Sequence, residues 1–120
     1  MPHKPTTKNK ALIRPADVVT VDFPGVTGIK RRPALIVSTE AYHSARPDVI
    51  IAILTSQVQG ARAVTDYVLK DWASAGLRQS SAFRAFLATV HASSVQIIGH
   101  LSDRDWKEVL IRLKQAISVA

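Results

Sequence analysis

The chain has 120 residues, 47% of them hydrophobic and 21% charged, which fits one globular domain and excludes an intrinsically disordered chain. The sequence has no cysteine, and its four histidines lack the spacing of a metal site. It also has no secretory signal and no apolar run near the roughly 20 residues of a membrane span. We therefore expect a cytoplasmic protein without metal or cofactor. The net charge of +7, from 16 Lys and Arg against 9 Asp and Glu, favours a polyanionic partner, nucleic acid before an anionic membrane.

Residues 1–14 carry more than half of this net charge and contain no acid. Their bases are Lys4, Lys8, Lys10 and Arg14. Because the segment is polar and contains proline, it is predicted to be a disordered arm ahead of one domain at 15–120. Within that domain, residues 15–102 carry a net charge of only +2 and residues 103–114 of +1. The basic cluster that remains is Lys30–Arg32.

The first half of the domain is predicted to contain three strands. They are expected at 17–23, 33–38 and 49–55. The first is rich in β-branched residues, and the other two are short, continuous apolar runs of the kind found in buried strands. Pro24 and two glycines predict a loop over 24–31, and a second loop is predicted over 39–47.

The second half is predicted to add weaker strands, one helical turn and a C-terminal helix. The strands are expected at 64–69, 82–90 and 94–98. Asp71 as N-cap and Gly76 as the stop residue mark the helical turn. Ser102 as N-cap, three residues before Asp105, opens the final helix in an arrangement like a capping box. The apolar stripe of that helix is Trp106, Val109, Leu110, Leu113 and Ile117, and it predicts a core or dimer face.

Together these elements predict a mainly β protein, with five or six strands in a small, strongly curved sheet or barrel and a C-terminal helix packed on it. No sequence signature of a nucleotide-binding loop, a zinc protease or a serine hydrolase is present. The acids of the body are expected to be solvated or to cap helices. His43 is expected to be structural or exposed in its loop.

One group of residues suits the binding of a phosphodiester. The basic cluster Lys30–Arg32 follows a glycine loop, and the strand after it ends in Thr55, Ser56 and Gln57. A guanidinium binds phosphate through two hydrogen bonds and stays charged, and a hydroxyl can donate to a phosphate oxygen. RNA carries its own nucleophile, the 2′-hydroxyl, so its cleavage requires no metal in principle.

Seven stretches of the chain match one family in order and spacing. They are DVVTVDF at 17–23, KRRPALIVS at 30–38, ILTSQ at 53–57, TDY at 65–67, DWxxAGL at 71–77, SAFR at 81–84 and IGHLS at 98–102. Over residues 15–118 the chain thereby resembles the MazF/PemK family, the toxins of type II toxin–antitoxin modules. The Arg-Pro-Ala strand followed by a strand ending in Thr is the most diagnostic pair.

The resemblance implies an SH3-like β-barrel that acts as a homodimer and has a small acidic antitoxin as its cognate partner. It implies sequence-selective, metal-independent cleavage of single-stranded RNA, mostly mRNA, through attack of the 2′-hydroxyl. By position, Arg32 is implied to clamp the phosphorane and shuttle protons, and Thr55 to orient the scissile phosphate. The residues predicted to contact RNA are Gly28, Lys30, Arg31, Ser56, Gln57 and Ser81.

Two other hypotheses stay open at the level of sequence. One is a non-catalytic module on the same fold that binds nucleic acid or another protein, since one fold serves several functions. The other is a general basic protein whose N-terminal arm is its main contact with nucleic acid. Binding of RNA without cleavage would favour the first, and loss of binding after deletion of residues 1–14 would favour the second.

Overall fold

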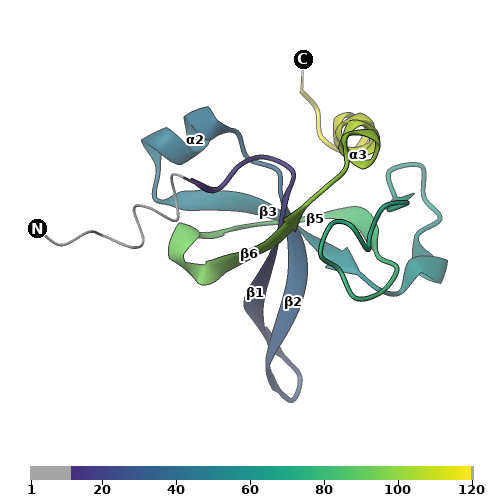
Figure 1. The fold of residues 1–120 in the computed structure, drawn as a ribbon, viewed down its shortest axis with the longest axis horizontal. Coiled ribbons are helices and arrows are strands. Elements are labelled where there is room, and N and C mark those ends of the chain that lie inside the picture. The colour runs from purple at the N-terminus through teal and green to yellow at the C-terminus, as the bar shows by residue number, and fades with distance from the viewer. Residues whose placement is uncertain (1–11, 120) are drawn as a thin grey trace, which may run out of the picture.

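A six-stranded antiparallel sheet with the strand order β4-β5-β3-β2-β1-β6 forms the body of the computed structural model, which describes residues 12–119 (Figure 1). The strands are β1 (Asp17–Gly25), β2 (Gly28–Ile36), β3 (Asp48–Thr55), β4 (Tyr67–Val68), β5 (Ala82–His91) and β6 (Val95–His100). The helices are α2 (Glu40–Ala45) and α3 (Asp103–Ala116), with 3₁₀ turns η1 (Val58–Gly60) and η2 (Ala92–Ser94). The predicted mainly β fold with a C-terminal helix is confirmed, and the sheet curls into a half-barrel.

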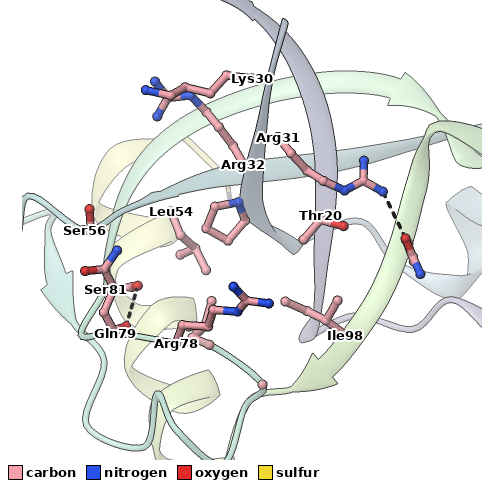
Figure 2. Close-up of a pocket in the computed structure, with 14 residues that line it drawn as sticks. Thr20, Lys30, Arg31, Arg32, Leu54, Ser56, Arg78, Gln79, Ser81 and Ile98 are labelled. Atoms are coloured by element: carbon pink, nitrogen blue, oxygen red, sulfur yellow. Dashed lines mark hydrogen bonds between the residues drawn. The ribbon is translucent and has the colours of Figure 1, made fainter.

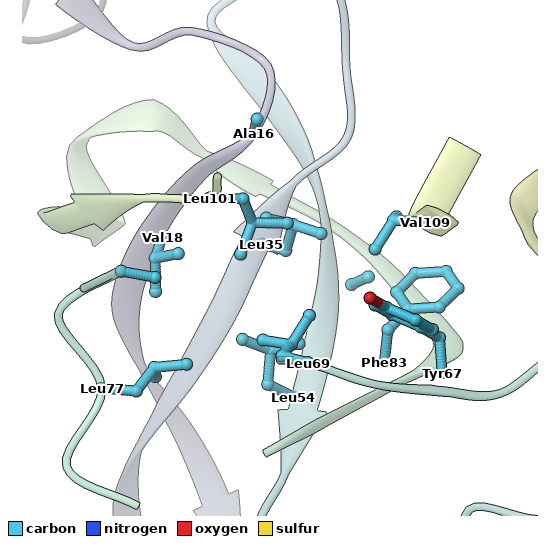
Figure 3. Close-up of a cluster of buried hydrophobic side chains, with 12 residues drawn as sticks. Ala16, Val18, Leu35, Leu54, Tyr67, Leu69, Leu77, Phe83, Leu101 and Val109 are labelled. Atoms are coloured by element: carbon cyan, nitrogen blue, oxygen red, sulfur yellow. The ribbon is translucent and has the colours of Figure 1, made fainter. Parts of the chain in front are cut away.

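The sheet buries apolar side chains on both of its faces. Val18 and Leu35 belong to one cluster, whereas their neighbours Val19 and Ala34 belong to the other, as the period of two along a strand requires. The first cluster is covered by α3, whose Val109 is fully buried against it (Figure 3). The continuous apolar runs of β2 and β3 are explained by this burial on two sides.

The predicted loop over 24–31 is wrong, because β1 and β2 continue through it as a hairpin. Gly25 pairs with Gly28, so the turn consists of Val26 and Thr27 alone. Gly28 has a φ of +128°, which glycine adopts without the steric cost that a Cβ brings. The hairpin projects from the body in Figure 1.

The predicted loop over 39–47 is also wrong, since it contains α2. The backbone N–H of Tyr42 donates to Oγ1 of Thr39, which caps the helix at 3.2 Å. His43 is buried rather than exposed, and its Nε2 lies 2.6 Å from Oγ of Ser38. The hydroxyl of Ser38 also accepts from the N–H of Ile50, so this structural histidine ties α2 to β3.

The predicted strand at 64–69 is reduced to the two residues of β4. Asp66 and Ala63 form a turn closed by two hydrogen bonds. The N–H of Asp66 donates to the Ala63 carbonyl, and the N–H of Ala63 donates to the Asp66 carboxylate. This turn leaves Val64 exposed and occupies the backbone before Tyr67, so the ladder with β5 begins only there.

Three acids that were expected to be solvated or capping are buried: Asp17, Asp66 and Asp105. Asp17 accepts from the N–H of Arg14 at 2.8 Å and lies 2.7 Å from Nδ1 of His100. Ser102 caps α3 as predicted, accepting from the N–H of Asp105 at 3.2 Å. The Asp105 carboxylate does not close a capping box and instead faces the segment that follows β4.

Asp105 is fully buried and accepts three hydrogen bonds, from the Tyr67 hydroxyl at 2.6 Å and from the N–H groups of Lys70 and Asp71 at 3.1 and 2.8 Å. The carboxylate of Asp71, predicted to cap the turn at 71–76, instead accepts from Arg104 at 2.9 Å and from Ser102 at 2.6 Å. The hydrogen bonds from Arg104, and after them the one from Ser102, lower the pKa of Asp71 to about 2. The segment after β4 is therefore fastened to α3 by two carboxylates.

Gly76 ends the helical turn as predicted, with a φ of +92° and with the N–H of Leu77 bound to the Trp72 carbonyl. A Cβ on Gly76 would lie 2.3 Å from the Ile98 carbonyl oxygen, and one on Gly99 would lie 1.9 Å from that of Ala75. The two backbones therefore touch, and β6 fixes the position of the residues that follow Gly76.

The predicted disordered arm lies outside the described residues as far as residue 11. Of its last residues, Ile13 is buried in the second apolar cluster. Arg14 is held through its N–H by Asp17, as described above. Packing thus begins before the predicted boundary at residue 15.

Candidate functional site

A cavity of about 730 Å³ opens between β2, β6 and the segment that joins β4 to β5 (Figure 2). Its basic lining residues are Lys30, Arg31, Arg32 and Arg78. Its polar lining residues are Thr20, Ser56, Gln79, Ser81 and Gln96, and its apolar ones are Pro33, Leu54, Leu77 and Ile98, with Gly76. Among the described residues that line it, none is an Asp, a Glu or a His, so the cavity has a positive charge that is not neutralised within it.

Two of the nine arginines differ from the rest in having no partner. Within residues 12–119, Arg32 and Arg78 alone among the arginines form no hydrogen bond or ion pair, and both line the cavity. The other seven bind carboxylates, side-chain nitrogen or oxygen atoms, or backbone carbonyls. Since a guanidinium donates readily to carboxylate or phosphate oxygens, these two are available to an anion from outside the chain.

Arg31 is held in place, in contrast to its two neighbours in the basic cluster. Its guanidinium donates to Oδ1 of Asp22 at 2.8 Å and to Oε1 of Gln96 at 3.0 Å, bridging β1 and β6. Figure 2 shows Lys30 and Arg32 leaving β2 on the side away from Arg31, as alternation along a strand requires. Arg31 also lines a smaller cavity of about 390 Å³, so its side chain borders both cavities.

Thr55 does not line the cavity and lies beyond the end of the β2–β3 ladder. Ala34 pairs with Ile53 at the end of the β2–β3 ladder. Arg32 on β2 and Thr55 on β3 each lie two residues beyond this last pair. Oγ1 of Thr55 accepts from the N–H of Gln57 at 3.0 Å, which fixes the hydroxyl at the end of β3.

The structure brings together five of the eight predicted site residues. Those that line the cavity are Lys30, Arg31, Arg32, Ser56 and Ser81. Ser81 is buried, and its hydroxyl donates to the carbonyl of Gln79 at 3.0 Å. Gln57 lies outside the lining beyond the end of β3, and Gly28 lies at the turn of the projecting hairpin.

The sequence decides the family to which these features belong. Residues 14–117 match the family described as PemK-like, MazF-like toxin of type II toxin–antitoxin system. The chain belongs to this toxin family. The resemblance over residues 15–118 is thereby confirmed, although a comparison with curated protein sequences gave no match.

Solved structures agree on the fold of this toxin domain. A chain of the MazE–MazF crystal structure (Form-III) from Deinococcus radiodurans is similar at a TM-score of 0.73 and 19% identity, over 91% of this chain and 99% of that one. An endoribonuclease in complex with its cognate antitoxin from a mycobacterial species gives 0.73 and 20%, over 90% and 97%. Toxin MazF-mt6 from Mycobacterium tuberculosis gives 0.67 and 22%, over 89% and 99%.

The cavity of the toxin domain includes residues that its sequence did not reveal: Thr20, Arg78, Gln79 and Gln96. Thr20 lies directly opposite Gln96 in the β1–β6 ladder, a relation that only the register discloses. Arg78 and Gln79 follow the Gly76 stop in a segment without periodicity. A signal existed there, since two long polar residues after a helix stop often lie at a surface, but it does not specify which surface.

Residues 12–119 contain no group of three His, Asp or Glu side chains placed to hold a metal ion. No helix in the same range is both long and apolar enough to cross a membrane.

Proposed function

We propose that this toxin is an endoribonuclease that cuts single-stranded RNA at the cavity between β2 and β6. The observation that carries the proposal is the pair of unpartnered arginines, Arg32 and Arg78, which line one cavity without an acid among its described lining residues. Two guanidinium groups suit the non-bridging oxygens of a phosphodiester. The neighbouring mycobacterial structure that is described as an endoribonuclease supports the same activity.

In the proposed reaction, the RNA supplies the nucleophile. The O2′ atom attacks phosphorus as its proton passes to water, a P–O2′ bond forms, and the P–O5′ bond breaks. The O5′ atom takes a proton from water, so the products are a 2′,3′-cyclic phosphate and a 5′-hydroxyl. Arg32 stabilises the charge of the phosphorane, and Thr55 orients the phosphate across from it. Arginine acts by charge here, because its side chain stays protonated in proteins.

The proposal extends to the partners of the toxin. A small acidic antitoxin would bind the same cavity, because its carboxylates would pair with the cations that await phosphate. The antitoxin thus competes with RNA for Arg32 and Arg78 and inhibits the toxin. We also propose that the toxin works as a homodimer in the cytoplasm.

The test is cleavage of a long single-stranded RNA by the purified full chain in EDTA, with the ends of the products mapped. We expect cuts at a preferred short motif, with cyclic phosphate and 5′-hydroxyl ends. Arg32→Ala should lower the rate by about 10²- to 10³-fold, the usual effect of removing one transition-state contact. Arg46→Ala removes an equal charge at an exposed position outside the cavity and is the matched control. Cleavage by Arg32→Ala at the wild-type rate would contradict the site.

A non-catalytic RNA-binding module is the second candidate. One observation favours it: among the described lining residues, the cavity has no Asp, Glu or His to act as a general base. The same RNA panel separates the two candidates, since the module would retain RNA in a filter or anisotropy assay and leave every phosphodiester intact.

A further inference from the structure

The polar rim of the cavity presents hydrogen-bond donors at Gln96 and Arg78. Oε1 of Gln96 accepts from the Arg31 guanidinium at 3.0 Å. A guanidinium has only donors, so the atom that meets it is the amide oxygen, and the Gln96 amide offers its N–H₂ to other partners. Arg78 adds a second set of donors with no acceptor within the described residues. The Ser81 hydroxyl donates its proton to the Gln79 carbonyl, so it stays an acceptor in the same rim.

The floor of the same cavity is apolar. Leu54 and Leu77 are almost fully buried, and Ile98 and Pro33 complete the surface beside them. Figure 2 shows Leu54 and Ile98 on either side of the Arg78 guanidinium, so the apolar groups and the donors face one space. A volume of about 730 Å³ is ample for a nucleotide and lies in the usual range for small-ligand sites. Apolar walls with a polar rim suit a flat, heteroaromatic ring.

Resting on the proposed RNA substrate, we propose that this cavity binds one unpaired guanine next to the phosphate held by Arg32, and that Arg78 reads the O6 and N7 edge of that base. Guanine presents two adjacent acceptors on this edge, which match the two parallel N–H groups of a guanidinium. Adenine presents one acceptor and an amino group there, and the amino group would face the donors of Arg78. Unpaired bases expose these edges in single-stranded RNA, where proteins read sequence.

The position of Arg78 is fixed firmly enough to read a base. The residue lies two positions after Gly76, whose backbone touches β6 at Ile98. The Asp22–Arg31–Gln96 chain holds the opposite side of the rim. A recognition group that starts from an ordered backbone and faces an ordered opposite rim discriminates better than one on a free loop.

Binding to short RNA tests the proposal directly. The probes are 2′-fluoro hexanucleotides of uridine with a single guanine, inosine, 7-deazaguanine or adenine, which lack the nucleophile and cannot be cut. Inosine keeps O6 and N7, whereas 7-deazaguanine lacks N7. We expect guanine and inosine to bind alike, and 7-deazaguanine and adenine to bind roughly 5- to 150-fold more weakly, which is the discrimination of one bidentate contact. Equal affinity for guanine and 7-deazaguanine would overturn the proposal.

Variants of Arg78 separate base reading from simple charge attraction. Arg78→Ala should bring the ratio of guanine to adenine affinity to about 1, and Arg78→Lys should do the same, because an ammonium keeps the charge without the paired donors. Arg46→Ala should leave the ratio at the wild-type value. Since Arg78 is exposed and has no described partner, both variants should fold, which circular dichroism verifies. A ratio unchanged in Arg78→Ala would refute the assignment.

Failure of the guanine site and failure of the nuclease are distinguishable. If the wild type shows the expected binding pattern and cuts no RNA, the base site stands and the endoribonuclease proposal fails. If the wild type cuts RNA at sites with no guanine at a fixed distance from the cut, the nuclease stands and the guanine site fails.

Discussion

Charged residues gather in two regions of this molecule, and the two differ in how the charges are matched. Where α3 meets the segment after β4, Arg104 binds Asp71 and Arg112 binds Glu108. In the cavity, Arg32 and Arg78 meet no acid among the described residues. In the first region, which we call the clamp, each of these arginines is paired with a carboxylate of the same chain. In the second, the arginines are available to an anion from outside the chain. The difference teaches that partnering, and not the density of charge, separates a binding surface from a scaffold.

The largest effect should come from breaking the clamp at Asp105. Asp105→Ala leaves the Tyr67 hydroxyl and two backbone N–H groups buried without an acceptor, which should lower the free energy of unfolding by about 3 kcal/mol or more. Denaturant titration measures this loss. Asp105→Asn keeps the shape and one acceptor oxygen, so it should cost less. Equal stability of Asp105→Ala and the wild type would show that these hydrogen bonds are not structural.

The next effect should appear at Thr55 and change activity without changing stability. Thr55→Val removes a hydroxyl at the end of β3, and the cleavage rate should fall by about 10²-fold while the midpoint of unfolding stays within a degree or two. Thr55→Ser, which keeps the hydroxyl, should retain most of the rate. If Thr55→Val cuts RNA as fast as the wild type, the phosphate does not lie against the end of β3.

A smaller effect distinguishes the two regions by salt. Each phosphate contact to a single strand adds about 0.7 to the slope of log affinity against log salt. Lys30→Ala should therefore reduce the slope for single-stranded RNA by about that amount, whereas Arg104→Ala should leave it unchanged, because Arg104 is paired with Asp71. Anisotropy titrations at several salt concentrations measure both slopes. An equal reduction by both variants would remove the distinction between cavity and clamp.

The smallest effect is the response of the clamp to acid. Its hydrogen bonds lower the pKa of Asp71 from 3.8 to about 2, so the ionised carboxylate is favoured in the folded state. The stabilisation is complete above pH 3.8 and is lost as the pH falls toward 2. Arg104→Ala should flatten this part of the stability profile, as thermal melts between pH 2 and pH 5 would show. An identical profile in Arg104→Ala would mean that another group titrates.

How much the sequence revealed depended on whether a residue's role was local. β2 and β3 could be predicted because a strand buried on both faces has a continuous run of apolar residues in its sequence. The outer hairpin was missed because Pro24 looked like a breaker. β6 pairs with β1 only as far as Val21, so Pro24 faces no strand on that side and its missing N–H costs nothing.

The candidate site divides in the same way. Arg32 and Thr55 were predicted from the family resemblance, as the Arg before the Pro-Ala of one strand and the Thr at the end of the next. Arg78 was missed because only the structure shows that it has no partner among the described residues. The lack of a partner depends on the three-dimensional surroundings and produces no pattern in the neighbouring sequence. Asp105 carried a local pattern, the spacing from Ser102, but its hydrogen bonds go to residues more than 30 positions away.

The contact between Gly76 and Gly99 has a consequence for engineering. Because the two backbones lie in contact, the segment after Gly76 starts from a fixed position. Leu77 packs into the first apolar cluster, whereas Arg78 and Gln79 after it are exposed and belong to neither cluster. Substitutions at residues 78 and 79 should therefore leave the fold unchanged. Under the proposed function, variants restricted to these two positions should change the sequence preference of the toxin. Gly99 must be kept, because a Cβ there would lie 1.9 Å from the Ala75 carbonyl oxygen.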